Sequence, residues 1–184
     1  MHSVIDGYLD KETVAQINRE WPTTWESIRP GHKFSTTKLS PTARKVVDSV
    51  DLGWLERLTG IEGLLADPSL NGGGFHCIPS GGRLGMHIDF NAHPLGWRRR
   101  VNMLIYLNED WQDEWGGFLQ LGIKSPALIK PIGGRAVIFE TTEDSYHGHP
   151  EPLKCPADRN RRSLALYFYT SDHPKEFHST IYVS

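Results

Sequence analysis

The chain has 184 residues with a formal net charge of −2, and 38% of them are hydrophobic and 23% charged. This length predicts one domain over residues 1–184, and the near-neutral charge argues against nucleic acid as a partner. No apolar run approaches the ~20 residues of a membrane span, and no signal peptide is visible. Because two cysteines, Cys77 and Cys155, also fit a reducing compartment, we expect a cytoplasmic protein with no membrane partner.

Residues 1–70 are expected to form a mainly helical N-terminal part. Asp10 is a suitable N-cap for a first helix, which Pro22 ends. A second helical pattern runs from Pro41 to Leu58, with Ser40 as its N-cap and an apolar face of valine, leucine and tryptophan. We therefore expect helices that precede the main body of the fold.

Residues 72–172 carry short apolar segments separated by turns rich in glycine and proline. The predicted strands are 75–78, 101–107, 117–121, 136–139 and 163–169. Many short strands at close spacing predict a mainly β domain of the sandwich or barrel type. The β core is therefore expected within 72–172.

The segment His87-Ile88-Asp89 can supply metal ligands. Residues two apart in a strand point to the same side, so His87 and Asp89 would converge on one point. They are two members of the 2-His-1-carboxylate facial triad that binds non-haem Fe(II). His147 and His149 are both candidates for the third ligand, and strand alternation does not separate them because they have equal parity.

Arg162 is a candidate for binding an anion. Alternation places it on the same strand face as Leu164 and Leu166, where a buried guanidinium would need an anionic partner. A carboxylate would satisfy it through two parallel hydrogen bonds. The neighbouring Arg161 has the opposite parity, so the pattern favours Arg162 for this role.

With these motifs the chain resembles the Fe(II)- and 2-oxoglutarate-dependent oxygenases, specifically their prolyl-4-hydroxylase-like branch. The segments that carry the resemblance are 87–91, 99–111, 114–121 and 146–150, with a weaker likeness at 4–9. The resemblance implies a double-stranded β-helix, a cupin-like jelly roll with N-terminal helices packed on one sheet. One departure is that Cys77 or Ile78 stands where some relatives have a tyrosine.

The resemblance also implies roles for individual residues. His87, Asp89 and His147 would hold the iron, since the family pattern His-Gly-x-Pro begins at His147. Arg162 would pair with the distal carboxylate of 2-oxoglutarate, and Tyr106 would donate to the same carboxylate. Alternation puts Asn102 on the strand face of Tyr106, so both side chains can reach the cavity.

The resemblance implies hydroxylation of an unactivated C–H bond by an enzyme that binds Fe(II) and uses 2-oxoglutarate and O2, with succinate and CO2 as co-products. Ascorbate is a further candidate cofactor. A prolyl residue, a free amino acid and a small metabolite are all open as substrates. Two alternatives are a cupin-like metalloenzyme that does not use 2-oxoglutarate and a catalytically silent β-helix binding module. His93 is expected in a loop near the substrate, and His149 either behind the metal ligands or near the entrance. The cationic residues 98–100 are expected in a solvated turn, with an acidic group of the substrate as the alternative partner.

Overall fold

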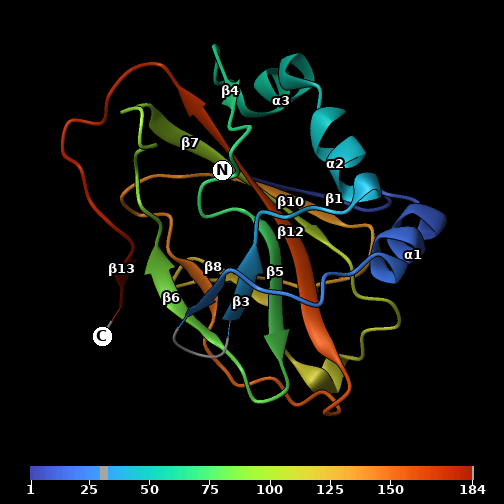
Figure 1. The fold of residues 1–184 in the computed structure, drawn as a ribbon. Helices are drawn as coiled ribbons and strands as arrows, with labels where there is room; N and C mark the ends of the chain where they lie inside the picture. Colours follow the sequence, from blue (N-terminus) through green and yellow to red (C-terminus); the bar gives the residue numbers. More distant parts are fainter. Residues whose placement is uncertain (30–32, 184) are drawn as a thin grey trace.

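A computed structural model describes residues 1–29 and 33–183 and places two antiparallel sheets face to face, with helices outside the larger one (Figure 1). The larger sheet has the order β1-β10-β7-β12-β5-β3-β2, and β4 pairs with β12 outside this path. Its strands are β1 (His2–Ile5), β2 (Ser27–Arg29), β3 (Lys33–Thr36), β4 (Leu65–Ala66), β5 (Gly74–Pro79), β7 (Arg98–Tyr106), β10 (Ala136–Glu140) and β12 (Asn160–Thr170).

The smaller sheet has the order β13-β6-β11-β8-β9. Its strands are β6 (Leu84–Ile88), β8 (Leu119–Leu121), β9 (Ala127–Ile129), β11 (His147–His149) and β13 (Ile181–Tyr182), and a 3₁₀-helix η1 (Asp113–Trp115) precedes β8. Between the sheets lies an apolar layer that includes Val137 and Phe139 from the larger sheet and Leu119 and Ile129 from the smaller one. The two packed sheets confirm the prediction of a mainly β jelly roll.

The helices are α1 (Lys11–Arg19), α2 (Pro41–Asp48) and α3 (Leu52–Thr59). Asp10 and Ser40 cap α1 and α2 as predicted. The single helix expected over 41–58 is wrong, because it is two helices. The side chain of Asp51 accepts a hydrogen bond from the amide of Trp54 at 3.0 Å and starts α3 as a separate helix.

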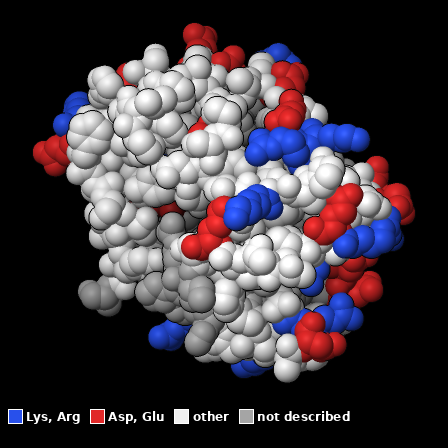
Figure 2. Space-filling model, viewed as in Figure 1, with Lys and Arg blue, Asp and Glu red and all other residues white. Residues whose placement is uncertain are grey.

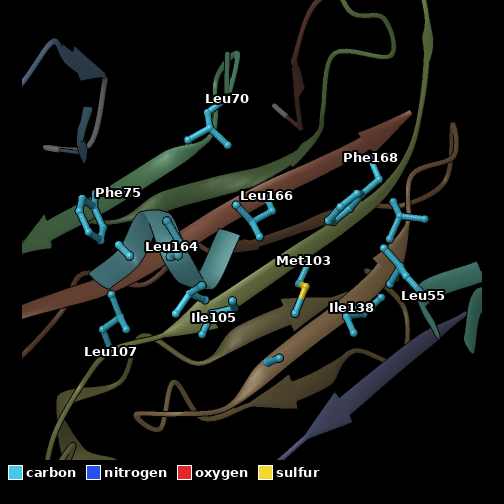
Figure 3. Close-up of a cluster of buried hydrophobic side chains, with 14 of the residues drawn as sticks. Leu55, Leu70, Phe75, Met103, Ile105, Leu107, Ile138, Leu164, Leu166 and Phe168 are labelled. Carbon is cyan, nitrogen blue, oxygen red and sulfur yellow. The ribbon is translucent and has the colours of Figure 1, made fainter. Parts of the chain in front are cut away.

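Helices α1, α2 and α3 cover the outer face of the larger sheet, as predicted. Ile17, Ala43 and Leu55 from these helices belong to one buried cluster with side chains of β5, β7 and β12. Figure 3 shows Leu164, Leu166 and Phe168 of β12 within this cluster, beside Met103 and Ile105 of β7. The helices and the outward face of the larger sheet therefore enclose a buried apolar core.

The N-terminal part is less helical than expected, since β1 to β4 also lie in residues 1–70. β1 pairs with β10 and β3 pairs with β5, so these strands extend the larger sheet on both sides. Each has at most four residues, too few for a period-2 pattern to stand out in the sequence. In the part of the chain that the structure describes, no helix is long and apolar enough to cross a membrane.

Candidate metal and co-substrate site

Two neighbouring strands of the smaller sheet bring His87, Asp89 and His147 together. β11 pairs with β6 so that His147 lies directly opposite His87, and Asp89 follows the last residue of β6. One ligand atom from each of the three side chains lies within 4.8 Å of the others. The strand pairing therefore joins residues that are sixty positions apart in the sequence into one cluster.

The distances within this cluster suit a shared metal ion. Nε2 of His87 lies 3.5 Å from Oδ1 of Asp89, and Nε2 of His147 lies 3.2 Å from Oδ2. Neighbouring ligands that each lie ~2.1 Å from a metal are roughly 3 Å apart, so little movement is needed. Two imidazoles and one carboxylate form the donor set that Fe(II) takes in non-haem oxygenases.

Backbone carbonyls set the orientation of both histidine rings. Nδ1 of His87 lies 2.8 Å from the carbonyl oxygen of Gly85, and Nδ1 of His147 lies 2.9 Å from that of Ser145. Each Nδ1–H can therefore donate to its carbonyl, which leaves Nε2 as the lone-pair nitrogen facing Asp89. This is the tautomer that a metal ligand requires.

Asp89 is an ionised carboxylate in this environment. Burial on its own raises the pKa of Asp89, but the charge of the Arg99 guanidinium opposes this effect, and the pKa lies well below the usual range. A carboxylate that stays ionised at neutral pH is ready to bind a cation without first losing a proton.

Gly148 allows the close contact between β11 and β6. A Cβ added there would lie 2.7 Å from the carbonyl oxygen of Gly85 and 2.8 Å from that of Leu84. Real side chains do not approach backbone oxygens so closely, so any other residue would push the strands apart. The glycine between the two histidines is therefore part of how His147 reaches His87.

Arg161 points into the cavity that contains the cluster. The cavity lies between the sheets and is lined by His76, Ile78, Leu84, His87, Asp89, Asn102, Leu104, Leu119, His147, Gly148, His149, Arg161, Ser163 and Tyr167. Arg161 is only 5% exposed, and its Nε donates to the carbonyl oxygen of Gly117 at 2.7 Å. A buried cation in the same cavity as the cluster provides a place for an anionic group.

Tyr106 and Asn102 both face this inner space, as alternation along β7 predicts. Nη2 of Arg161 donates to the hydroxyl oxygen of Tyr106 at 3.2 Å. Burial raises the pKa of Tyr106 although the charge of Arg161 opposes the shift, so its hydroxyl stays protonated at neutral pH. Asn102 instead donates to Oδ2 of Asp89 at 2.7 Å, and so contacts the cluster itself.

Arg162 lies outside the cavity, so the prediction that placed it there is wrong. Its Nη1 donates to Oδ1 of Asn18 in α1 at 3.0 Å, and its guanidinium lies 4.7 Å from the ring centre of Trp21. Alternation did group Arg162 with Leu164 and Leu166, but that apolar face packs under the helices. The face of β12 toward the cavity carries Arg161, Ser163 and Tyr167. These polar side chains at alternate positions were the sequence feature that could have identified the cavity face.

The other candidate histidines lie in two different places. His149 is buried in the cavity wall but is not a member of the cluster. His93 does not line this cavity. Its ring stacks on Trp97 with centroids 5.0 Å apart, and Nε2 lies 3.4 Å from Oδ1 of the buried Asp67. His93 therefore packs within the connection between β6 and β7, against Trp97 and Asp67.

Ile78 and Cys77, the two candidates for the position of the missing tyrosine, lie on opposite faces of β5. Ile78 lines the cavity, whereas the Cys77 thiol lies near Arg162 and Trp21 on the helix side. An apolar side chain therefore stands in the cavity wall at this point. His76, on the same face as Ile78, also lines the cavity, although sequence reasoning singled it out for no role there.

Arg99 does not lie in a solvated turn as expected, but is 1% exposed and contacts Asp89. A β-bulge explains the difference. Val101 pairs with Phe168 and Arg99 with Tyr169, so β7 has one extra residue, Arg100, at this point. The bulge breaks the alternation and turns Arg99 toward the side of Asn102. Nothing in the sequence marks the bulge, so alternation could not find this residue.

The C-terminal segment lies beside the cluster. β13 pairs with β6 so that Tyr182 is opposite His87, with ring centroids 5.3 Å apart. In Figure 1 the segment runs along the outer edge of the smaller sheet. Figure 2 shows charged side chains gathered over the helices, whereas the region around β6 and β13 on this face is largely uncharged.

Three solved structures share this fold along most of the chain. A prolyl-4-hydroxylase from Pseudomonas putida is 21% identical, with 92% of each chain covered and a TM-score of 0.62. A prolyl hydroxylase from Trichoplax adhaerens, in complex with a hypoxia inducible factor peptide, is 18% identical with a TM-score of 0.66, and the match covers 91% of this chain and 83% of that one.

The third is HygX from Streptomyces hygroscopicus, with nickel, 2-oxoglutarate and hygromycin B bound. It is 16% identical with a TM-score of 0.64, and the match covers 92% of this chain and 83% of that one. The search of curated proteins gave no match. These three likenesses show that the chain has the double-stranded β-helix fold of prolyl-4-hydroxylase-like enzymes.

The family model of the 2OG-Fe(II) oxygenase superfamily matches residues 73–169, more than half of the chain. The matched segment includes the three cluster residues, Arg161 and Tyr106. The chain therefore belongs to the 2OG-Fe(II) oxygenase superfamily and is a 2-oxoglutarate-dependent oxygenase.

Proposed function

We propose that this protein binds Fe(II) through His87, Asp89 and His147 and uses 2-oxoglutarate and O2 to hydroxylate an unactivated C–H bond, with succinate and CO2 as co-products. The observation that carries the proposal is the cluster itself: two imidazoles and an ionised carboxylate within 4.8 Å, facing a cavity that also contains a buried arginine. Bound Fe(II) would supply the redox chemistry that couples decarboxylation of 2-oxoglutarate to hydroxylation.

We assign the distal carboxylate of 2-oxoglutarate to Arg161, in place of Arg162. Arg161 is oriented by Gly117 and Tyr106, and it faces the same cavity as the cluster. Tyr106 stays protonated and can donate a second hydrogen bond to the carboxylate. Leu104 and Leu119 in the cavity wall exclude water from the reacting groups.

The substrate is proposed to be a prolyl residue, a free amino acid or a small metabolite. Two of the similar structures support both a peptide and a small molecule, since one holds a peptide and the other hygromycin B. The superfamily membership argues against the two alternatives, a metalloenzyme that does not use 2-oxoglutarate and a silent binding module.

Succinate formation from 2-oxoglutarate tests the proposal. The purified protein would be incubated with Fe(II), ascorbate and 2-oxoglutarate, with and without a panel of prolyl peptides, amino acids and metabolites. We expect substrate-dependent succinate together with a product heavier by one oxygen atom. Asp89→Ala is the control, because it removes the carboxylate from the cluster. Succinate at equal rates from both proteins would contradict the proposed site.

A further inference from the structure

Arg99 is a buried cation held against the carboxylate of the cluster. Its side chain is 0% exposed, that of Asp89 is 12% exposed, and Nη2 donates to Oδ2 at 2.9 Å. A guanidinium is costly to remove from water without an anionic partner. The contact with Asp89 therefore stabilises both charges in the folded protein.

Asn102 completes a closed set of hydrogen bonds with these two residues. Its Oδ1 accepts from Nε and Nη2 of Arg99 at 3.0 and 2.7 Å, while its Nδ2 donates to Oδ2 of Asp89 at 2.7 Å. Oδ2 thus accepts two hydrogen bonds, one from each partner. A carboxylate oxygen has two in-plane lone pairs, so these two donors occupy Oδ2, which also lies 3.2 Å from Nε2 of His147. Oδ1 receives no hydrogen bond from Arg99 or Asn102 and faces Nε2 of His87 at 3.5 Å.

We propose that Arg99 is a positioning residue that, together with Asn102, restricts Asp89 to binding the metal through a single oxygen. This inference rests on the proposed function, since it concerns the same metal. Bidentate binding by Asp89 would have to break a hydrogen bond from Arg99 or Asn102. A carboxylate that contributes one ligand atom keeps three positions open for 2-oxoglutarate and O2.

Aromatic rings hold the Arg99 guanidinium in its place. Its Cζ lies 4.3 Å from the ring centre of Phe90 and 3.4 Å from that of Tyr167, and the Tyr167 hydroxyl donates to the carbonyl oxygen of Gly72 at 3.1 Å. The flat face of the guanidinium thus packs on aromatic rings, while its N–H groups contact Asn102 and Asp89. Lysine can keep the charge but cannot reproduce the stacking and the two-pronged contact with Asn102.

Binding of Co(II) to the protein, free of 2-oxoglutarate, tests the inference without relying on activity. Arg99→Lys keeps a cation beside Asp89 and Arg99→Gln removes it. Arg98→Gln is the matched control, because the adjacent Arg98 is exposed and pairs with Asp172 at 3.6 Å. We expect a 10- to 100-fold weaker Co(II) affinity for both Arg99 variants, the range found for residues that orient metal ligands. Arg98→Gln should match the wild type.

The visible absorption of bound Co(II) separates positioning from general damage to the fold. If Asp89 becomes bidentate, the coordination number rises and the absorption should weaken and shift in Arg99→Lys, although thermal unfolding of the metal-free variant resembles that of the wild type. In an Asp89→Asn background, Arg99→Lys should cause no further spectral change, since the carboxylate is gone.

Two outcomes distinguish this inference from the proposed function. If the wild type does not bind Co(II), the proposed metal site fails and the inference fails with it. If the wild type binds Co(II) and Arg99→Lys and Arg99→Gln give the same spectrum and an affinity within twofold, only the positioning role is overturned. A variant that does not fold is replaced by Asn102→Leu, which removes one of the two donors to Oδ2 and must shift the spectrum in the same direction.

Discussion

Arg161 donates a hydrogen bond across the inner face of the larger sheet to the hydroxyl oxygen of Tyr106, at 3.2 Å. The two residues come from the paired strands β12 and β7, and Gly117 holds the other side of the guanidinium. Arg161 is therefore oriented before any ligand binds, and little side-chain entropy has to be lost when an anion arrives.

The first prediction concerns 2-oxoglutarate. Arg161→Ala should raise the KM for 2-oxoglutarate by roughly 10- to 100-fold, because a hydrogen bond to a charged group contributes about 1.5–3 kcal/mol. Arg162→Ala is the matched control, since the neighbouring side chain contacts Asn18 on the opposite face. Steady-state succinate formation would measure both. A larger effect from Arg162→Ala would indicate that 2-oxoglutarate binds on the helix-covered face and would contradict the assignment to Arg161.

The second prediction concerns the metal. His87→Ala, Asp89→Ala and His147→Ala should each abolish hydroxylation and weaken Ni(II) or Co(II) binding, because each removes one of three ligands. His149→Ala is the control in the same cavity and should keep most of the metal affinity. Calorimetric titration with the metal measures the difference. Loss of metal in His149→Ala with retention in His147→Ala would reverse the choice between them.

The third prediction concerns Gly148. Gly148→Ala should destabilise the protein by about 1–3 kcal/mol and weaken metal binding, because the new methyl group would meet two carbonyl oxygens of β6. Gly85→Ala, on the paired strand, is the control. Its Cβ would meet only the Tyr182 ring, at 3.4 Å, an ordinary contact. Thermal unfolding and metal titration of both variants check this, and equal effects would count against the strand-spacing argument.

The fourth prediction concerns Tyr182, whose ring lies 5.3 Å from that of His87. Tyr182→Ala should weaken metal affinity about 2- to 10-fold, since an aromatic contact of this kind contributes about 0.5–1.5 kcal/mol. Phe177→Ala removes a similar ring from the same segment, but Phe177 is 67% exposed and should not alter the affinity. If both variants bind the metal as the wild type does, the contact does not support His87.

The fifth prediction concerns Cys77. Burial raises the pKa of its thiol from the ordinary 9.0 to about 11, against the opposing charge of Arg162. At pH 8 the native thiol should therefore resist iodoacetamide, and denaturant should make it reactive. Between about pH 9 and 11 the unfolded state loses this proton first, so stability should fall as pH rises. Rapid alkylation of Cys77 in the native protein at pH 8 would show that it is not buried.

Much of this protein could be predicted from local sequence patterns. Short apolar segments between glycine and proline turns predicted the mainly β fold, and Asp10 and Ser40 predicted two helix starts. The pair His87 and Asp89 followed from alternation, and a histidine near 147 completed the pattern. Each of these predictions depends on residues close in sequence or on a motif, so it does not require knowledge of how distant strands pack.

Tertiary structure decided which side of each strand faces the cavity. Both faces of β12 are buried, so its apolar residues did not mark the cavity: Leu164 packs under the helices, while Arg161 lines the site. The bulge at Arg100 turned Arg99 toward Asp89, and pairing of β11 with β6 selected His147 over His149. Alternation gives only the relative direction of side chains within one strand, whereas the cavity is defined by how separate strands and helices pack.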